Sequence, residues 1–175
     1  MAEKYQYYNT NDDGAGRISR ENWHGQTFTP AIAHKITSMK LKLYSDWSPG
    51  PVTVSIRATD AEGKPTGEDL CSGTIDGNTL THDELGEWYE ITLGEGCDLE
   101  ADKKYAIVVR VPDSGSYDYL FWRYDQTDPT YVRGNRVYSA NAGKLWTADT
   151  SRDSMFEEWG EEIKVAGRSF GYVYY

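Results

Sequence analysis

Met39–Tyr44, with the sequence MKLKLY, is the stretch that decides the fold, because apolar and charged side chains alternate along it. Successive side chains of a β-strand point to opposite faces, so its methionine and two leucines share one face and its two lysines share the other. The same period of two runs through Val52–Arg57 (VTVSIR), Tyr89–Leu93 (YEITL) and Lys103–Pro112 (KKYAIVVRVP). These four stretches predict strands that are buried on one face only, as in antiparallel sheets with one face in water.

Turn signals separate these stretches at short intervals. Gly, Pro, Asp and Asn cluster at Ser48–Pro51, Asp60–Gly67, Asp76–Asn78, Gly94–Gly96, Pro112–Gly115 and Asn141–Gly143. Glycine reaches positive φ, proline fixes φ, and Asp and Asn bond to the nearby backbone, so such clusters are typical of turns. Four further strands are expected at Gln26–Pro30, Leu70–Ile75, Tyr117–Tyr124 and Asn135–Ala140. Many short strands between turns predict an all-β sandwich or barrel rather than alternating strands and helices.

Residues 153–165 fit two kinds of structure. Met155, Phe156, Trp159 and Ile163 fall on one face of a helix, for which Asp153 is a candidate cap. The same stretch also alternates as a strand. Because everything around it is β, we favour the strand.

The composition indicates a globular chain whose partners are neither nucleic acids nor lipids. Its 175 residues include 14 Tyr, 6 Trp and 4 Phe, more aromatic residues than disordered segments carry. The formal net charge of -10 predicts repulsion from phosphate backbones and anionic lipid. The N-terminal residues Met-Ala-Glu-Lys lack the apolar run of a signal peptide, and no run approaches 18 apolar residues. We therefore expect no membrane insertion and no secretion signal.

No linker, repeat or shift of composition divides the chain, which predicts a single domain over residues 1–175. The core is expected at about residues 23–160, and the terminal segments 1–22 and 161–175 are expected to be edge strands or docking tails. The aromatic residues near the C-terminus are predicted to form an assembly interface: Phe170, Tyr172, Tyr174 and Tyr175. They either complete the domain's own sheets or add to a neighbour's sheet.

Cys71 and Cys97 are the two cysteines, 26 residues apart. Together with three histidines they fit no zinc-binding spacing. A disulfide between neighbouring strands and a pair of buried free thiols are both open, and the free thiols are at least as well favoured.

Motifs of catalysis are absent from the sequence. It contains no G-x-S-x-G, H-E-x-x-H, P-loop or G-x-G-x-x-G motif. The three histidines, His24, His34 and His82, are scattered along the chain. Glu157 and Glu158 are neighbours, so on a strand they point to opposite faces and cannot form the facing carboxylates of a glycosidase. We predict no catalytic residue, and a polysaccharide-active hydrolase is the least favoured hypothesis.

Several short blocks occur together in a familiar order. They are Trp23–Pro30, Ile36–Tyr44, Val52–Asp60, Gly63–Gly67, Trp88–Leu93, Lys104–Val109, Trp146–Ala148 and Asp153–Gly160. This series resembles the jelly-roll-like surface module of the choice-of-anchor type, which recurs in bacterial extracellular proteins and tailed-phage structural proteins. The resemblance covers about Trp23 to Gly160 and carries over no catalytic motif. It implies a two-sheet antiparallel β-sandwich displayed on a cell or virion surface.

The first functional hypothesis is a non-enzymatic structural module. The lack of a signal peptide favours a virion component, a capsid decoration or tail protein, that assembles with copies of itself or with other virion or surface proteins. The alternative is a carbohydrate-binding adhesion module that contacts cell-surface glycan, because one face of Tyr117–Tyr124 leaves aromatic rings at the surface. The candidate glycan-binding residues are Trp47, Tyr117, Asp118, Tyr119, Trp122, Arg123 and Tyr124.

Calcium is the one metal that the acidic turns suggest, and no cofactor is required. Ca²⁺ takes six to eight oxygen ligands, which carboxylates in turns supply. The candidate ligands of a structural Ca²⁺ are Asp12, Asp13, Asp60, Glu62 and Asp69. The full EF-hand pattern is absent.

Overall fold

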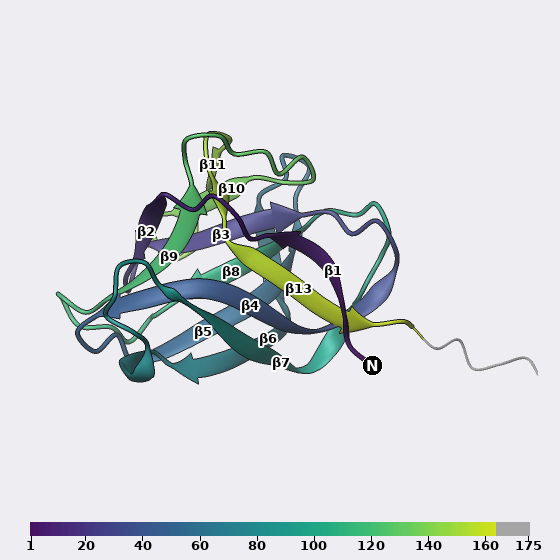
Figure 1. The fold of residues 1–175 in the computed structure, drawn as a ribbon. Helices are drawn as coiled ribbons and strands as arrows, with labels where there is room; N and C mark the ends of the chain where they lie inside the picture. Colours follow the sequence, from purple (N-terminus) through teal and green to yellow (C-terminus); the bar gives the residue numbers. More distant parts are fainter. Residues whose placement is uncertain (164–175) are drawn as a thin grey trace, which may run out of the picture.

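The computed structural model describes residues 1–163, which form two antiparallel sheets without an α-helix (Figure 1). The strands, in chain order, are β1 (Glu3–Tyr8), β2 (Gly14–Ile18), β3 (Trp23–Phe28), β4 (His34–Asp46), β5 (Pro51–Thr59), β6 (Pro65–Asp76), β7 (Glu87–Leu99), β8 (Tyr105–Arg110), β9 (Tyr119–Asp125), β10 (Arg136–Ser139), β11 (Thr147–Asp149), β12 (Asp153–Ser154) and β13 (Phe156–Glu161). A 3-10 turn, η1, spans Gly77–Thr79. The predicted all-β, two-sheet sandwich is confirmed. Within the described part of the chain, no helix is long and apolar enough to span a membrane.

The seven-stranded sheet is organised around the long strand β4. β7 pairs with one side of β4, whereas β13 and then β9 pair with successive parts of its other side. β1 continues the sheet beyond β13, and β2 and β12 both pair with β9. The six-stranded sheet has the order β11-β10-β3-β8-β5-β6. Neither order follows the chain, so long-range pairing holds both sheets together.

The core lies between the two sheets and follows the predicted alternation. Met39, Leu41 and Leu43 of β4 have no exposed surface, whereas the two lysines between them reach the solvent side. Each such side chain contributes roughly 1.5 to 3 kcal/mol when it is buried. For β8 the prediction that one face of the strand is exposed to solvent is wrong. Its Ala106 and Val108 are also buried, because they pack with Val137, Trp146 and Trp23 in a second, smaller cluster.

Some predicted boundaries also differ from the structure. The glycines of Gly94–Gly96 do not end a strand but lie inside β7, at positive φ, where the β4–β7 register shifts. Glycine tolerates this φ, and an irregularity of this kind bends a strand without ending it. The ambiguous segment is a strand, β12 followed by β13, through Glu161.

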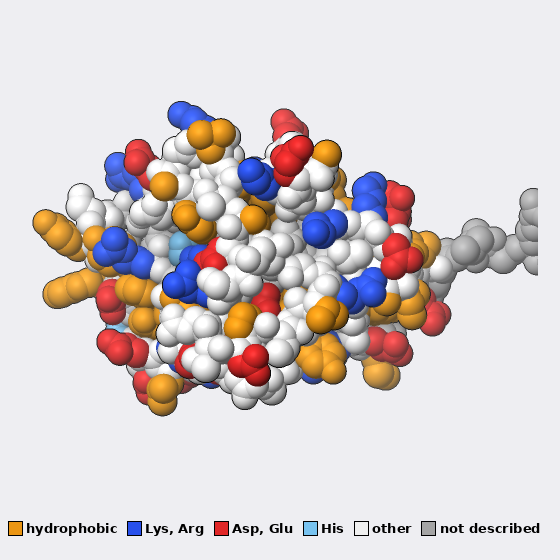
Figure 2. All heavy atoms as spheres, turned by 90° about the horizontal axis from the view of Figure 1, so that it is seen from above, with side chains coloured by type: hydrophobic (Ala, Val, Ile, Leu, Met, Phe, Trp, Pro, Cys, Tyr) orange, Lys and Arg blue, Asp and Glu red, His pale blue; other side chains and the backbone are white. Residues whose placement is uncertain are grey.

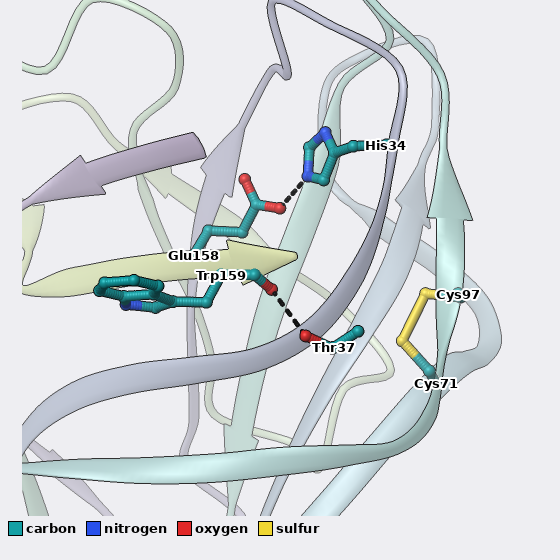
Figure 3. Close-up of a disulfide and its surroundings, with 6 residues drawn as sticks. All are labelled: His34, Thr37, Cys71, Cys97, Glu158 and Trp159. Carbon is teal, nitrogen blue, oxygen red and sulfur yellow. Dashed lines mark hydrogen bonds and ion pairs between the residues drawn. A yellow bond between two sulfur atoms is a disulfide. The ribbon is translucent and has the colours of Figure 1, made fainter. Parts of the chain in front are cut away.

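A disulfide joins the two sheets along one side of the sandwich. Cys71 lies in β6, at the edge of one sheet, and Cys97 lies in β7, at the edge of the other; their Cα atoms are 5.6 Å apart (Figure 3). Between β6 and β7 the backbones also meet closely, because a Cβ added at Gly73 would lie 1.9 Å from the carbonyl oxygen of Thr92. Of the two alternatives that the sequence left open, the structure therefore shows the disulfide.

The N-terminal segment belongs to the sandwich rather than outside it. β1 runs beside β13 in the seven-stranded sheet, and β2 pairs with β9 (Figure 1). Tyr8 is buried, and its hydroxyl donates to the carboxylate of Asp125 over 2.6 Å. Residues 1–22 thus complete the domain's own sheet. Phe170, Tyr172, Tyr174 and Tyr175 lie outside the described residues, so the predicted assembly interface stays a prediction.

Candidate ligand-binding site

Two connections bring exposed aromatic side chains to one end of the sandwich. Asp46, the last residue of β4, pairs with Tyr119, the first residue of β9. Trp47, which follows β4, therefore lies at the same end of the sheet as Tyr117, which is in the β8–β9 connection. The backbone N–H of Ser48 lies 3.5 Å from Oδ1 of Asp118, which links the two connections. We call Trp47, Tyr117 and Tyr119 the aromatic end.

Two of these rings are unusually exposed for their size. Trp47 is 75% exposed and Tyr117 is 77% exposed. Figure 2 shows hydrophobic side chains standing out from the surface at this end, on the left of the view. Large rings left in water cost free energy, and exposed apolar groups of this kind mark contact surfaces.

A polar hollow of about 320 Å³ lies beside the aromatic end. Its lining includes Arg17, Ser19, Arg20, Asn22, Ser114 and Tyr119. The guanidinium of Arg17 lies 4.6 Å from the centre of the Tyr119 ring, and Nη2 of Arg20 donates to the carbonyl oxygen of Ser114 over 3.2 Å. The Ser114 hydroxyl is buried and has no hydrogen-bond partner among the described residues. The hollow thus offers two cations and one carboxylate, that of Glu21, next to an aromatic ring.

A row of rings on the outer face of the sheet holds Tyr119 in place. Tyr44 stacks on Phe121, with ring centres 4.6 Å apart, and Tyr119 packs edge-on against Phe121. Burial raises the pKa of Tyr44, so this phenol stays neutral near pH 7. The row makes the Tyr119 side of the aromatic end a prearranged surface.

The structure brings together four of the seven predicted glycan-binding residues, Trp47, Tyr117, Asp118 and Tyr119. For Trp122 the prediction is wrong, because this side chain is 1% exposed and its Nε1 donates to the carbonyl oxygen of Met155. β9 has aromatic residues on both faces, and alternation alone does not tell which face turns inward.

Arg123 and Tyr124 are half-buried but lie away from the aromatic end. Arg123 is ion-paired with Asp12 at 2.8 Å. Tyr124 is five residues along β9 from Tyr119, about 16 Å at the rise of a strand. Sequence reasoning missed Arg17, Arg20 and Ser114, which come from segments about a hundred residues apart, and no local pattern marks them.

The five predicted calcium ligands are engaged in ion pairs or turns. Asp12 is paired with both Lys42 and Arg123. Asp69 lies between Arg57 and Arg110; burial opposes ionisation of Asp69, but the hydrogen bonds from these arginines outweigh it and lower its pKa.

The other three candidates lie in turns. Asp13 accepts from Thr127 and from the backbone of Gln126. Asp60 accepts the backbone N–H groups of Glu62 and Lys64. In residues 1–163 no group of three or more His, Cys, Asp or Glu could hold a metal ion. The structure therefore does not bring these carboxylates together.

Two histidines are buried, away from the aromatic end. His34 and Glu158 form a hydrogen-bonded ion pair with no exposed side-chain surface (Figure 3). The Tyr5 ring stacks on His34, with the ring centres 3.7 Å apart. Burial disfavours the charged imidazole, but the hydrogen bond and charge of Glu158 outweigh it and raise the pKa of His34. His24 is different, because burial, assisted by the Arg136 charge, lowers its pKa to about 3.

Comparison with known proteins finds a likeness in fold and none in sequence. No family model and no curated protein matches the chain. A solved structure, that of the cysteine protease and lectin-like domains of Cwp84, a surface layer associated protein of Clostridium difficile, superposes with a TM-score of 0.60 at 11% identity. The match covers 93% of this chain and 36% of that chain. At this identity the likeness supports the fold alone, and the resemblance to the choice-of-anchor type stays a prediction.

Proposed function

We propose that this protein is a non-enzymatic surface module that binds carbohydrate through its aromatic end. One observation carries the proposal: two connections that are far apart in sequence bring Trp47 and Tyr117 to the same end of the sandwich, both about three-quarters exposed. Neither ring is needed there to cover the core, so a ligand surface accounts for their exposure.

The chemistry of this end suits a sugar. A Trp or Tyr ring offers a flat apolar face, against which the C–H face of a pyranose can pack. Arg17, Arg20 and Asp118 supply donors and acceptors beside the rings. Ligand sites combine apolar surface with a few placed polar groups in this way.

Two further points support a surface location. The disulfide between Cys71 and Cys97 is of a kind that persists in oxidising compartments, outside the cytoplasm. The superposed structure comes from a surface-layer-associated protein whose title names a lectin-like domain. Both points favour an extracellular module over a cytoplasmic one.

A second candidate function is assembly, as a virion or surface structural component. The observation that favours it is the edge strand β1, whose pairing among the described strands is with β13 alone. An open edge can add to the sheet of a second copy or of another surface protein.

The test is a glycan array followed by titration of two variants. Trp47 has a φ of 61°, which asparagine tolerates, so the first single variant is Trp47→Asn; the second is Tyr117→Ala. Each change is expected to weaken binding of the best array ligand at least tenfold and to leave the melting temperature nearly unchanged. The control is Tyr7→Ala, which removes an exposed ring on β1.

Two outcomes would count against glycan binding. One is a blank array from folded protein, which would leave assembly as the function. The other is an affinity that falls equally in the Tyr7→Ala control. Running the array with calcium and with chelator also tests the predicted Ca²⁺, whose removal should abolish binding if a calcium ion shapes the site.

A further inference from the structure

A second hollow, unrelated to the aromatic end, opens where the two sheets meet at the side of the sandwich. It measures about 330 Å³ and is lined by Arg136, Tyr138, Ala148, Asp149 and Arg152. β10 and β11 supply the first four of these residues, and Arg152 precedes β12, which pairs with β9 of the other sheet. We call it the arginine pocket.

The arginine pocket has more positive than negative charge. Oδ2 of Asp149 accepts from Nη1 of Arg136 and from Nη1 of Arg152, both over 2.8 Å, so one carboxylate serves two guanidinium groups. Nη2 of Arg136 lies 3.2 Å from Nδ1 of His24, which is neutral near pH 7 because of its lowered pKa and adds no charge. A local charge of about +1 thus remains in a protein whose formal net charge is -10.

The donors of both arginines are incompletely used. The side chain of Arg136 is 8% exposed, and the Nε–H groups of Arg136 and Arg152 are buried with no acceptor among residues 1–163. A buried donor without a partner destabilises the fold, more so when it is charged. An oxyanion entering the pocket would not reach these buried Nε–H groups, but it would meet the side chain of Arg152, which is 37% exposed, and would offset the excess charge.

Aromatic rings flank the charged groups. The guanidinium carbon of Arg136 lies 5.4 Å from the ring centres of both Tyr124 and Tyr138, and that of Arg152 lies 5.3 Å from Tyr124. Tyr138 is partly exposed, so it presents a ring to whatever enters. The volume is at the lower end of ligand pockets and suits one ring-sized group.

We propose that the arginine pocket binds an acidic sugar, a pyranose that carries a carboxylate or sulfate. The oxyanion faces Arg152, the more exposed of the two arginines, and is attracted by the charge of both, and the sugar ring packs on Tyr138. This inference extends the proposed glycan binding to an anionic ligand class, but it involves other residues and stands or falls separately.

The experiment is a calorimetric titration of the whole chain with glucuronate, with glucose as the neutral control. We expect glucuronate to bind at least tenfold more tightly than glucose, and we expect its affinity to fall as salt is added. Arg152→Gln should reduce the affinity for glucuronate at least tenfold. The matched control is Arg133→Gln, since Arg133 is 36% exposed against 37% for Arg152 and is also paired with one aspartate, Asp102.

Three outcomes would overturn the proposal. The first is equal affinity for glucose and glucuronate, and the second is an equal loss of glucuronate affinity in Arg152→Gln and Arg133→Gln. The third is inorganic sulfate that binds as tightly as glucuronate, which would mean that the pocket binds free anions and does not recognise a sugar. A Tyr138→Ala variant supplies a second probe if Arg152→Gln proves unstable, and it should also weaken glucuronate at least tenfold.

The aromatic end is separated from the arginine pocket by one further variant. If Trp47→Asn abolishes neutral glycan binding and leaves glucuronate unaffected, both proposals hold. If glucuronate binding is lost in Trp47→Asn and kept in Arg152→Gln, the arginine pocket is ruled out and the aromatic end is retained.

Discussion

His34 and Glu158 place a charged pair where neither side chain touches water. The raised pKa of His34 means that the folded state holds its proton more tightly than the unfolded state does. The stabilisation is therefore complete below the unfolded value of about 6.5 and is lost as pH rises through the higher folded value. We expect the melting temperature to fall over that range, as measured by circular dichroism at a series of pH values.

A variant assigns this pH dependence to the pair. Glu158→Gln removes the charge that holds the proton on His34, so it should flatten the alkaline decline and cost about 3 kcal/mol near pH 6. His82 is an exposed histidine, and His82→Gln should leave the profile as in the wild type. An unchanged slope in Glu158→Gln would show that another group titrates.

At this scale the sequence predicts burial well where the two faces of a strand differ in polarity. Met39, Leu41 and Leu43 are buried as expected, because lysines mark the other face. The sequence predicts burial poorly where both faces of a strand are aromatic, as for Trp122, since ring size and hydropathy then do not tell which face is buried. A partner supplied by a distant strand, such as Glu158 for His34, leaves no local signal either.

At the scale of elements, the contact between β6 and β7 is the feature with the clearest consequence for stability. The disulfide closes a loop of 26 residues, for which the chain-entropy relation gives about 3.5 kcal/mol. The double variant Cys71→Ser/Cys97→Ser should lose that amount in urea unfolding. Reductant should destabilise the wild type equally and leave the variant unaffected; a wild type that ignores reductant would contradict the bond.

Strand existence follows from the sequence, but strand length and pairing do not. β4 extends from His34 to Asp46, well beyond the predicted Met39–Tyr44, because β13 and β9 supply partners for its two ends. The glycines inside β7 look like a turn in isolation and become an irregularity of the strand because β4 runs alongside. Neighbouring strands decide both outcomes, and periodicity contains no information about neighbours.

At the scale of the whole molecule, the N-terminal strand is part of the folded unit. Deleting residues 1–9 removes β1 and with it the buried side chains of Gln6 and Tyr8. The loss of one buried aromatic side chain costs about 3 kcal/mol or more, so the shortened chain should be strongly destabilised in thermal unfolding. Deleting only Met1 and Ala2, which precede β1, is the control and should have little effect.

A shortened chain that stays as stable as the wild type would mean that β1 is an accessory tail.

The all-β sandwich itself could be predicted from the sequence, because alternation and turns recur along the chain. The aromatic end was accessible in part, since exposed rings next to turns can be recognised. The hollow of Arg17, Arg20 and Ser114 and the arginine pocket could not, because each gathers residues that only the folded sheets bring together.

The bond between Cys71 and Cys97 also limits how far the molecule can be stretched. An extended chain covers about 3.4 Å per residue, so a closed loop of 26 residues withholds about 90 Å of length from a pulling force. In the proposed function, a surface module that binds a ligand in flowing liquid would act as a tether. With the disulfide formed, the protein would extend less under the same force than its reduced form.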